Sequence, residues 1–248
     1  MATIDFQKLF LEKLNNQVQQ YNICGVVTTD GVVYPLGSDT KVLSTIFELV
    51  TRPIIANIAT ENRLIYVEPS VQNHYPDFTL MENADDPKKI AIDVKTTYVD
   101  NLGDTFSYTL GGYTSFIRGN GKKNIVYPYS QYSEHWVVGY VYQRVAKKKA
   151  AGLQTFKIED LPKISLPFDH VQVFVQKKWK ISSDRAGSGN TTNIGSIRGT
   201  IDDFRNGNTP FRTEAEFLDY WRNYERTAAE RKGKFSNITE FRRRHWIK

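Results

Sequence analysis

Two short segments of the 248-residue sequence carry side chains that could act together on a phosphate ester. Asp77 follows a proline in residues 75–78, and Asp93 and Lys95 are separated by one residue in segment 90–95. Two converging carboxylates supply the hard oxygen ligands that Mg²⁺ prefers, and such an ion shares phosphate oxygens with its substrate. A neighbouring ammonium can orient an attacking water, help to deprotonate it and offset charge in the transition state. Together these residue types indicate metal-assisted phosphodiester hydrolysis.

The residue order in segment 90–95 predicts a β-strand that carries Asp93 and Lys95 on one face. Branched apolar residues at positions 90, 92 and 94 alternate with Ala91, Asp93 and Lys95. Because strand side chains alternate between faces, the apolar set should enter the core while Asp93 and Lys95 project together. A hairpin loop at residues 83–87 would place Asp77 beside Asp93. Surface ion pairs on a strand would produce the same short pattern, so the pattern alone leaves both interpretations open.

Apolar periodicity and turn signals predict the elements that position these side chains. Helices are expected over residues 6–18, after an N-cap at 37–39, and over 214–232, with Pro53 kinking or breaking the second one. Strands are expected on both sides of a turn at 29–31 and at 64–68, 76–82, 89–98, 105–110, 132–146 and 171–181. Residues 184–196 form a polar loop. Glu48, on the second helix, is most simply a solvated helix residue.

Charge is distributed unevenly along the chain. The formal net charge is +6, with 11 basic and 14 acidic residues in positions 1–124 and 22 basic and 13 acidic residues in positions 125–248. A metalloenzyme that acts on a polyanion needs carboxylates for cations and basic side chains for phosphates. Solvated lysine faces can give the same balance, so charge alone does not establish nucleic-acid binding.

Several other kinds of site are excluded by composition. The single cysteine, Cys24, allows no internal disulfide and suits a reducing compartment, and the four histidines are scattered, which argues against zinc. No phosphate-cradling Gly-x-x-x-x-Gly-Lys loop is present, so no nucleotide cofactor is expected. The N-terminus lacks the pattern of a signal peptide, and no apolar stretch is expected to reach the length of a membrane span. We therefore expect a cytoplasmic protein with no membrane partner.

Five longer segments resemble the EcoRV family of type II restriction endonucleases, which belongs to the PD-(D/E)xK nuclease superfamily. They are residues 37–49, 72–80, 110–118, 186–197 and 216–227, and they follow the same order over essentially the whole chain. The resemblance implies an α/β (α+β) restriction-endonuclease-like core, in which a mixed central β-sheet is flanked by helices. It also implies a homodimer that grips double-stranded DNA between its subunits. Hydrolysis of one phosphodiester per strand would depend on Mg²⁺ and serve a restriction-modification system.

The resemblance also assigns roles to individual residues. Asp77, Asp93 and Glu48 would bind the metal, with Lys95 as the catalytic lysine and Glu48 as an auxiliary acid. The implied base contacts are Gly187, Gly189, Asn190 and Thr191 in the major groove and Gln72 and Asn73 near the minor groove. The implied phosphate contacts are Thr40, Lys41, Thr97, Thr114, Ser115 and Lys123. One domain would span residues 1–248, with dimerisation and catalysis in roughly 1–150 and DNA recognition in roughly 151–248.

The chemistry of the implied DNA contacts is reasonable, although composition alone also fits a flexible linker at residues 187–193. Glycine lets backbone groups approach base edges, and Asn190 could pair with adenine N6 and N7. A Thr191 methyl could pack on a thymine methyl. Thr40 and Lys41 lie at a helix N-terminus, where free N–H groups can seat a phosphate.

The matching recognition segments imply the palindrome GATATC, cut at its centre to leave blunt ends. A palindromic site calls for a two-fold protein, which the implied homodimer would supply. Two other interpretations remain: a repair or recombination nuclease of the same superfamily that reads DNA structure, and a catalytically inactive DNA-binding protein on the same fold. The presence of Asp77, Asp93 and Lys95 together argues against the second, because binding alone needs no carboxylate pair beside phosphates.

Overall fold

The computed structural model describes residues 4–15, 21–71, 74–111, 113–119, 124–145, 154–187, 193–225, 228–231 and 233–245. Its centre is a five-stranded sheet with the order β3-β4-β5-β6-β8, in which only β5 and β6 pair in parallel. The strands are β3 (Ile65–Val67), β4 (Phe78–Met81), β5 (Lys89–Val99), β6 (Tyr132–Arg144) and β8 (Phe168–Lys177). The expected mixed sheet flanked by helices is confirmed. The predicted recognition segment contributes β8 to this sheet.

Alternating side chains give the sheet two apolar faces, each with its own core. One core contains Ile90, Ile92 and Val94 of β5 and is covered by the helices α1 (Phe6–Asn15) and α2 (Thr40–Glu61). The other contains Ala91 and is covered by α4 (Ile201–Asn206) and α5 (Glu214–Asn223). The alternation predicted for β5 is therefore confirmed. Asp93 and Lys95 share the parity of Ala91 and project on the second face.

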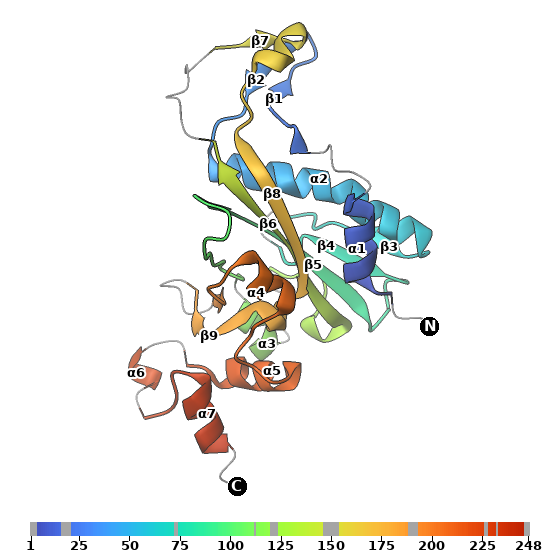
Figure 1. Ribbon diagram of the computed structural model, residues 1–248. Coiled ribbons are helices and arrows are strands. Elements are labelled where there is room, and N and C mark those ends of the chain that lie inside the picture. The colour runs from blue at the N-terminus through green and yellow to red at the C-terminus, as the bar shows by residue number, and fades with distance from the viewer. Residues whose placement is uncertain are drawn as a thin grey trace.

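Smaller elements extend the molecule at both ends of the central sheet (Figure 1). A three-stranded sheet lies at one end, and the C-terminal helices lie at the other. The small sheet contains β1 (Gly25–Val27), β2 (Val32–Pro35) and β7 (Phe156–Lys157), and a two-stranded sheet contains β9 (Ser182–Ala186) and β10 (Ile194–Ser196). The other helices are α3 (Tyr113–Gly119), α6 (Ala228–Arg231) and α7 (Ile238–His245). Short 3₁₀ helices are η2 (Tyr129–Gln131), η3 (Ile158–Lys163) and η4 (Lys178–Ile181).

Helix α2 begins at the expected cap and is longer than expected. The side chain of Asp39 accepts hydrogen bonds from the N–H groups of Lys41 and Val42. The helix has 22 residues and continues through Pro53, so Pro53 does not break it, and the kink expected as the alternative stays a prediction. By length and composition it could cross a membrane, which corrects the expectation that no segment reaches that length. In this fold its buried face packs on the sheet: Phe47 stacks on Tyr140 of β6, with ring centroids 4.8 Å apart.

Four further sequence-based boundaries need correction. Residues 105–110 form no strand, because Phe106 and Thr109 make only isolated bridges, to Gly199 and Gly195. The strand expected at 171–181 ends at Lys177 and turns into η4. The helix expected over 214–232 ends at Asn223, where Tyr224 leaves helical geometry and packs its ring 4.8 Å from that of Trp221. The polar loop predicted at 184–196 was wrong at both ends, because residues 184–186 belong to β9 and residues 194–196 form β10.

Gly139 allows β6 and β8 to pack closely beside the strand that carries Lys95. It pairs with Lys95 of β5 on one side and with Phe174 of β8 on the other. A Cβ atom at this position would lie 2.0 Å from Cε1 of Phe174, which is closer than two non-bonded carbon atoms can approach. Because Gly139 has no side chain, the Phe174 ring can pack against β6 in the second core.

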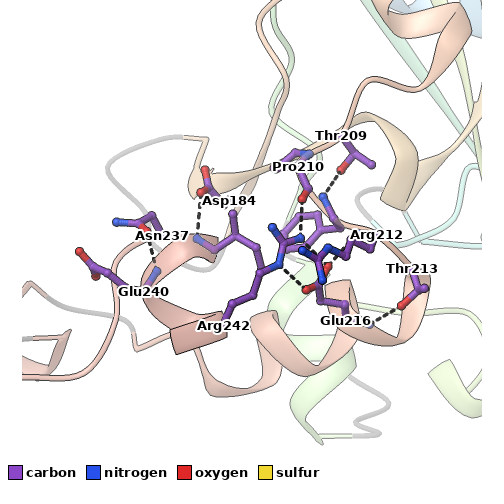
Figure 2. Close-up of polar contacts among 11 residues, drawn as sticks. Asp184, Thr209, Pro210, Arg212, Thr213, Glu216, Asn237, Glu240 and Arg242 are labelled. Atoms are coloured by element: carbon purple, nitrogen blue, oxygen red, sulfur yellow. Dashed lines mark hydrogen bonds and ion pairs between the residues drawn. The ribbon is translucent and has the colours of Figure 1, made fainter. Parts of the chain in front are cut away.

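The C-terminal helix α7 is fastened to the rest of the chain by polar contacts (Figure 2). Arg242 donates from Nε to Glu216 Oε1 at 2.7 Å and from Nη2 to Glu216 Oε2 at 2.8 Å, a two-pronged ion pair with α5. The same Nη2 donates to the carbonyl of Pro210 at 2.9 Å. Asp184 of β9 accepts from the N–H of Ile238 at 3.0 Å, which fixes the start of α7. Through Asp184, α7 is therefore bound to β9, the strand that leads into the predicted recognition loop.

Replacing Arg242 by glutamine should lower the free energy of unfolding by about 1–2 kcal/mol near neutral pH, because charge-assisted hydrogen bonds are lost. The Arg242 guanidinium holds the pKa of Glu216 below its ordinary value of 4.5. When the pKa of a carboxyl group is lower in the folded protein than in the unfolded chain, the ionised group stabilises the fold. This contribution is complete at pH values above the pKa of the unfolded chain and is lost as the pH falls through the pKa of the folded protein. Urea denaturation should therefore show the difference near pH 7 and a smaller one below pH 4.5.

Arg243→Gln is the matched control for this experiment, because Arg243 is the exposed neighbour of Arg242 on the same helix. An equal loss of stability in the two variants at both pH values would contradict the proposed role of the ion pair.

Candidate active site

The β4–β5 hairpin brings Asp77 and Asp93 together. Phe78, the first residue of β4, pairs with Ile92, so Asp77 lies opposite Asp93 at the start of the ladder. Asp77 Oδ2 accepts a hydrogen bond of 2.6 Å from the N–H of Val94, the residue after Asp93. The expectation that a hairpin at 83–87 would place the two acids side by side thus agrees with the register of the strands.

A buried lysine closes this hairpin. Lys89 is inaccessible to solvent, and its Nζ donates to the carbonyls of Ala84 and Asp86 at 2.8 and 2.6 Å and to Gln131 Oε1 at 2.9 Å. A buried ammonium is stable only when its donors are satisfied, and here three oxygens satisfy them. Lys89 therefore holds the loop end of the hairpin against η2 and helps to set the register that pairs Asp77 with Asp93.

Asp93 lies between two ammonium groups. Lys95 Nζ is 2.8 Å from Asp93 Oδ1, and Lys178 Nζ is 3.1 Å from Asp93 Oδ2. Asp93 and Lys178 are both buried, whereas Lys95 is partly exposed. Each oxygen of the Asp93 carboxylate therefore has a cationic partner, one from its own strand and one from η4.

The two carboxyl groups differ in their electrostatic surroundings. Burial and the negative charge of Asp93 raise the pKa of Asp77 to about 7, against the opposing effect of Lys95. Burial also disfavours the charged form of Asp93, but Lys178 and Lys95 outweigh it and hold the pKa of Asp93 well below its ordinary value. Burial lowers the pKa of Lys178 to about 8, with Asp93 opposing the shift. The two ammonium groups therefore stabilise the charged form of Asp93 more than that of Asp77.

Aromatic rings wall the site on the side of β6. Tyr75 Oη is 2.7 Å from His135 Nδ1, and the Lys178 ammonium lies 4.1 Å from the centroid of the Tyr75 ring. His135 stacks on Tyr129 with centroids 4.7 Å apart and pairs in register with Ala91. Burial and the nearby Lys178 charge keep the pKa of His135 well below its ordinary value. A neutral histidine and apolar rings therefore line the inner wall behind Asp93.

Comparisons with known proteins show the family of this chain. The family model described as "Restriction endonuclease EcoRV" matches residues 17–246. The chain belongs to the EcoRV restriction endonuclease family. It is 55% identical over 237 residues to the type II restriction enzyme EcoRV of Escherichia coli, a match that covers 96% of this chain and 95% of that protein. The family predicted from the sequence is thus confirmed. A solved NlaIV restriction endonuclease covers 99% of the chain at 13% identity and a TM-score of 0.39.

Enzymes of the EcoRV family depend on a metal ion, and the acidic pair fits one. Asp77 and Asp93 offer oxygen donors from adjacent strands, which suits a hard divalent cation. Burial and the negative charge of Asp93 raise the pKa of Asp77, and a cation bound beside its carboxylate would oppose this rise. Both oxygens of Asp93 already contact an ammonium, so a bound cation would have to share or replace one of these contacts.

Glu48, the third acid predicted at an EcoRV-type site, lies close enough to interact with it electrostatically. It sits on α2 between Phe47 and Thr51, whose side chains both contact Tyr140. Burial raises the pKa of Glu48, Arg52 opposes the rise, and Lys95 and Asp93 act on it more weakly. In the part of the chain that the structure describes, no three His, Cys, Asp or Glu side chains form one metal-binding group. Metal binding by Glu48 therefore stays a prediction.

The predicted phosphate contacts differ in accessibility. Thr40, Lys41 and Ser115 are exposed, and Thr97 is partly exposed on β5. Thr114, by contrast, is only 3% exposed, so its side chain does not face solvent. At the N-terminus of α2 the N–H groups of Lys41 and Val42 already donate to Asp39, at 2.9 and 3.2 Å. The N–H groups of Lys41 and Val42 are therefore not free to seat a phosphate, and phosphate binding by Thr40 and Lys41 stays a prediction.

Of the predicted base contacts, only Gly187 falls within the described residues. Gln72, Asn73, Gly189, Asn190 and Thr191 lie outside them, as does the predicted phosphate contact Lys123. The N–H of Gly187 donates to the carbonyl of Asn193 at 2.8 Å, and its own carbonyl accepts from Thr109 at 3.2 Å. A Cβ atom on Gly187 would lie 2.9 Å from Cα of Gly195. Close packing of β9 on β10 thus requires this glycine, and its contact with a base stays a prediction.

Sequence reasoning missed Lys178. No local pattern marks this lysine, because it lies 85 positions after the aspartate that it contacts. The one available signal is its place directly after an apolar strand and before Trp179. Only the β6–β8 pairing, which returns the chain to the same sheet face, brings its ammonium to Asp93.

Proposed function

We propose that this protein is a type II site-specific deoxyribonuclease that hydrolyses both strands of a palindromic DNA site with Mg²⁺ as its cofactor. The observation that supports this most directly is the Asp77–Asp93–Lys95 cluster in a chain 55% identical to a type II restriction enzyme. The proposed target is GATATC, cut at its centre to leave blunt ends. The same proposal assigns the base contacts to Gln72 and Asn73 and to Gly187, Gly189, Asn190 and Thr191.

The residues of the site would have different roles in hydrolysis. Asp77 and Asp93 would hold the metal ion, which supplies Lewis-acid stabilisation of charge on the phosphate when bound. Lys95, whose ammonium is partly exposed and 2.8 Å from Asp93, would point its remaining donors at the scissile phosphate and the attacking water. The buried rings behind Asp93 would exclude bulk water and strengthen these interactions.

The proposed active form is a homodimer, because a palindrome presents the same half-site twice. The small β1–β2–β7 sheet and the adjoining η3 expose apolar side chains that suit contact with a second copy: Val26, Val27, Tyr34, Ile158 and Leu161. Exposed apolar patches of this kind often mark interfaces.

A plasmid of known sequence with one GATATC site tests the proposed function. With Mg²⁺, the protein should convert the circular plasmid to one linear band whose sequenced ends are blunt at the centre of the site. With a chelator it should leave the plasmid intact. A plasmid in which the site is changed to GATTTC serves as the matched substrate and should stay circular.

The alternatives predict different results in the same experiment. A structure-reading repair nuclease would produce nicks or a smear that do not depend on the site. An inactive DNA-binding protein would retard the duplex in a gel without cutting it at any Mg²⁺ concentration. Either result, in place of the discrete band, would contradict the proposed function.

A further inference from the structure

Lys178 carries a buried charge that the proposed chemistry does not yet use. Its side chain is 1% exposed, and its ammonium is 3.1 Å from Asp93 Oδ2. A buried charge persists only when it is paired, and removal of one partner of such a pair is costly. Lys178 comes from η4, outside the segments that contain the two aspartates and Lys95.

The surroundings of Lys178 fix its position firmly. Its ammonium lies 4.1 Å from the centroid of the Tyr75 ring, a distance typical of a cation–π contact. Its carbonyl accepts a 2.7 Å hydrogen bond from the Ser182 hydroxyl, which locks the turn between η4 and β9. Tyr75 precedes Pro76 and Asp77, so Lys178 contacts both acid-bearing segments of the site. This side chain therefore has little freedom to leave Asp93.

We propose that Lys178 is a positioning residue that fixes one carboxylate oxygen of Asp93 and limits the affinity of the acidic pair for divalent cations. Lys178 holds Oδ2 from the buried side, while Lys95 approaches Oδ1 from the more accessible side. The carboxylate plane is thereby fixed, and one ammonium charge stays close to the place where a cation would bind. This inference rests on the proposed metal-dependent cleavage.

Two opposite consequences follow from loss of the Lys178 charge. A like charge near a bound cation repels it, so its removal should strengthen cation binding. A misplaced catalytic group slows the reaction, because a shift of about 1 Å can cost on the order of 100-fold in rate. A residue with a purely structural role would weaken metal binding and cleavage together. The combination of tighter binding and slower cleavage is therefore specific to the proposed role.

Lys178→Met tests the proposal, because methionine has a similar length and no charge. Mn²⁺ binding to the DNA-free protein, measured by electron paramagnetic resonance, should become on the order of tenfold tighter as the repulsion is removed. Single-turnover cleavage of a GATATC duplex with Mg²⁺ should slow on the order of 100-fold. Lys177→Met is the matched control: Lys177 is the preceding residue, and its ammonium lies 3.6 Å from Glu134 and away from the site. It should match the wild-type protein in both measurements.

Lys178→Gln separates the effect of the Lys178 charge from that of its hydrogen bond to Asp93. It also tests the proposal if Lys178→Met does not fold. Glutamine keeps an N–H donor for Asp93, so Mn²⁺ binding should again tighten while the rate falls less than in Lys178→Met. Unchanged or weaker Mn²⁺ binding, or an unchanged rate, would overturn the role of Lys178. If the wild-type protein itself neither binds Mn²⁺ nor cuts DNA, the proposed function fails instead.

Discussion

Asp93→Asn is expected to slow single-turnover cleavage of a GATATC duplex on the order of 10³-fold, because it removes several kcal/mol of transition-state stabilisation. Asparagine has nearly the shape of aspartate but lacks the charge that attracts a divalent cation. It would also leave Lys95 and Lys178 beside each other without their shared anion. Cleavage is measured by quenched-flow or manual sampling with enzyme in excess over duplex.

The readouts for Asp93→Asn must separate chemistry from folding. Breaking a buried ion pair destabilises a protein by roughly 3–5 kcal/mol, so thermal denaturation is followed in parallel and cleavage is measured well below the midpoint. Asp85→Asn is the matched control, since Asp85 is exposed in the loop that joins β4 to β5. DNA binding without metal should survive in both variants. Cleavage by folded Asp93→Asn within tenfold of the wild-type rate would rule out Asp93 as a metal ligand in catalysis.

Lys95→Met is expected to slow cleavage by about 10²–10⁴-fold, the usual effect of removing a group that assists proton transfer or charge stabilisation. Lys95 is the partly exposed member of the Asp93 ion-pair system, so it is the ammonium that a bound phosphate can reach. Metal-independent duplex binding, measured by gel retardation, should change little. The effect should therefore appear in the rate of the chemical step.

The stability of Lys95→Met should stay close to that of the wild-type protein. Lys95 is partly exposed, so its ion pair should contribute little net free energy, and Lys178 still neutralises Asp93. Lys88→Met, one residue before β5 and exposed, is the matched control and should cut normally. A rate loss in Lys95→Met that is matched by an equal loss of folded protein would show that Lys95 acts through the fold.

These two experiments and the Lys178 variants examine the three residues of one ion-pair cluster. Asp93 supplies the charge, Lys95 faces the accessible side, and Lys178 faces the core. The expected signatures differ accordingly: slower cleavage with lower stability for Asp93→Asn, slower cleavage alone for Lys95→Met, and slower cleavage with tighter cation binding for Lys178→Met.

Local sequence patterns predicted much of the fold because they act over short distances. The alternation in β5 determined which side chains enter the core, and the structure has the same alternation. Asp39 as a cap and the turn at 29–31 were also predicted correctly, because a side chain or a turn residue acts on backbone groups a few positions away. The family resemblance rested on longer segments, and the family model confirms it.

Predictions failed where tertiary packing outweighed local preference. Pro53 lies inside a helix that the sheet supports through contacts such as Phe47 on Tyr140. Residues 105–110 have the composition of a strand but find only isolated partners, at Gly195 and Gly199. A strand needs a neighbour of matching length to pair its backbone groups, and no sequence pattern states whether the fold will supply one.

The sequence by itself predicted the candidate reactive groups, two acids and a lysine on adjacent strands, and carried a family likeness that indicates DNA cleavage. Only the tertiary structure decided how charge is balanced around them. Lys178 reaches Asp93 because β8 returns to the central sheet beside β6, and its charge is the largest of the effects that lower the pKa of Asp93. Electrostatic interactions depend on distance in space and on burial, and neither quantity can be read from separation along the chain.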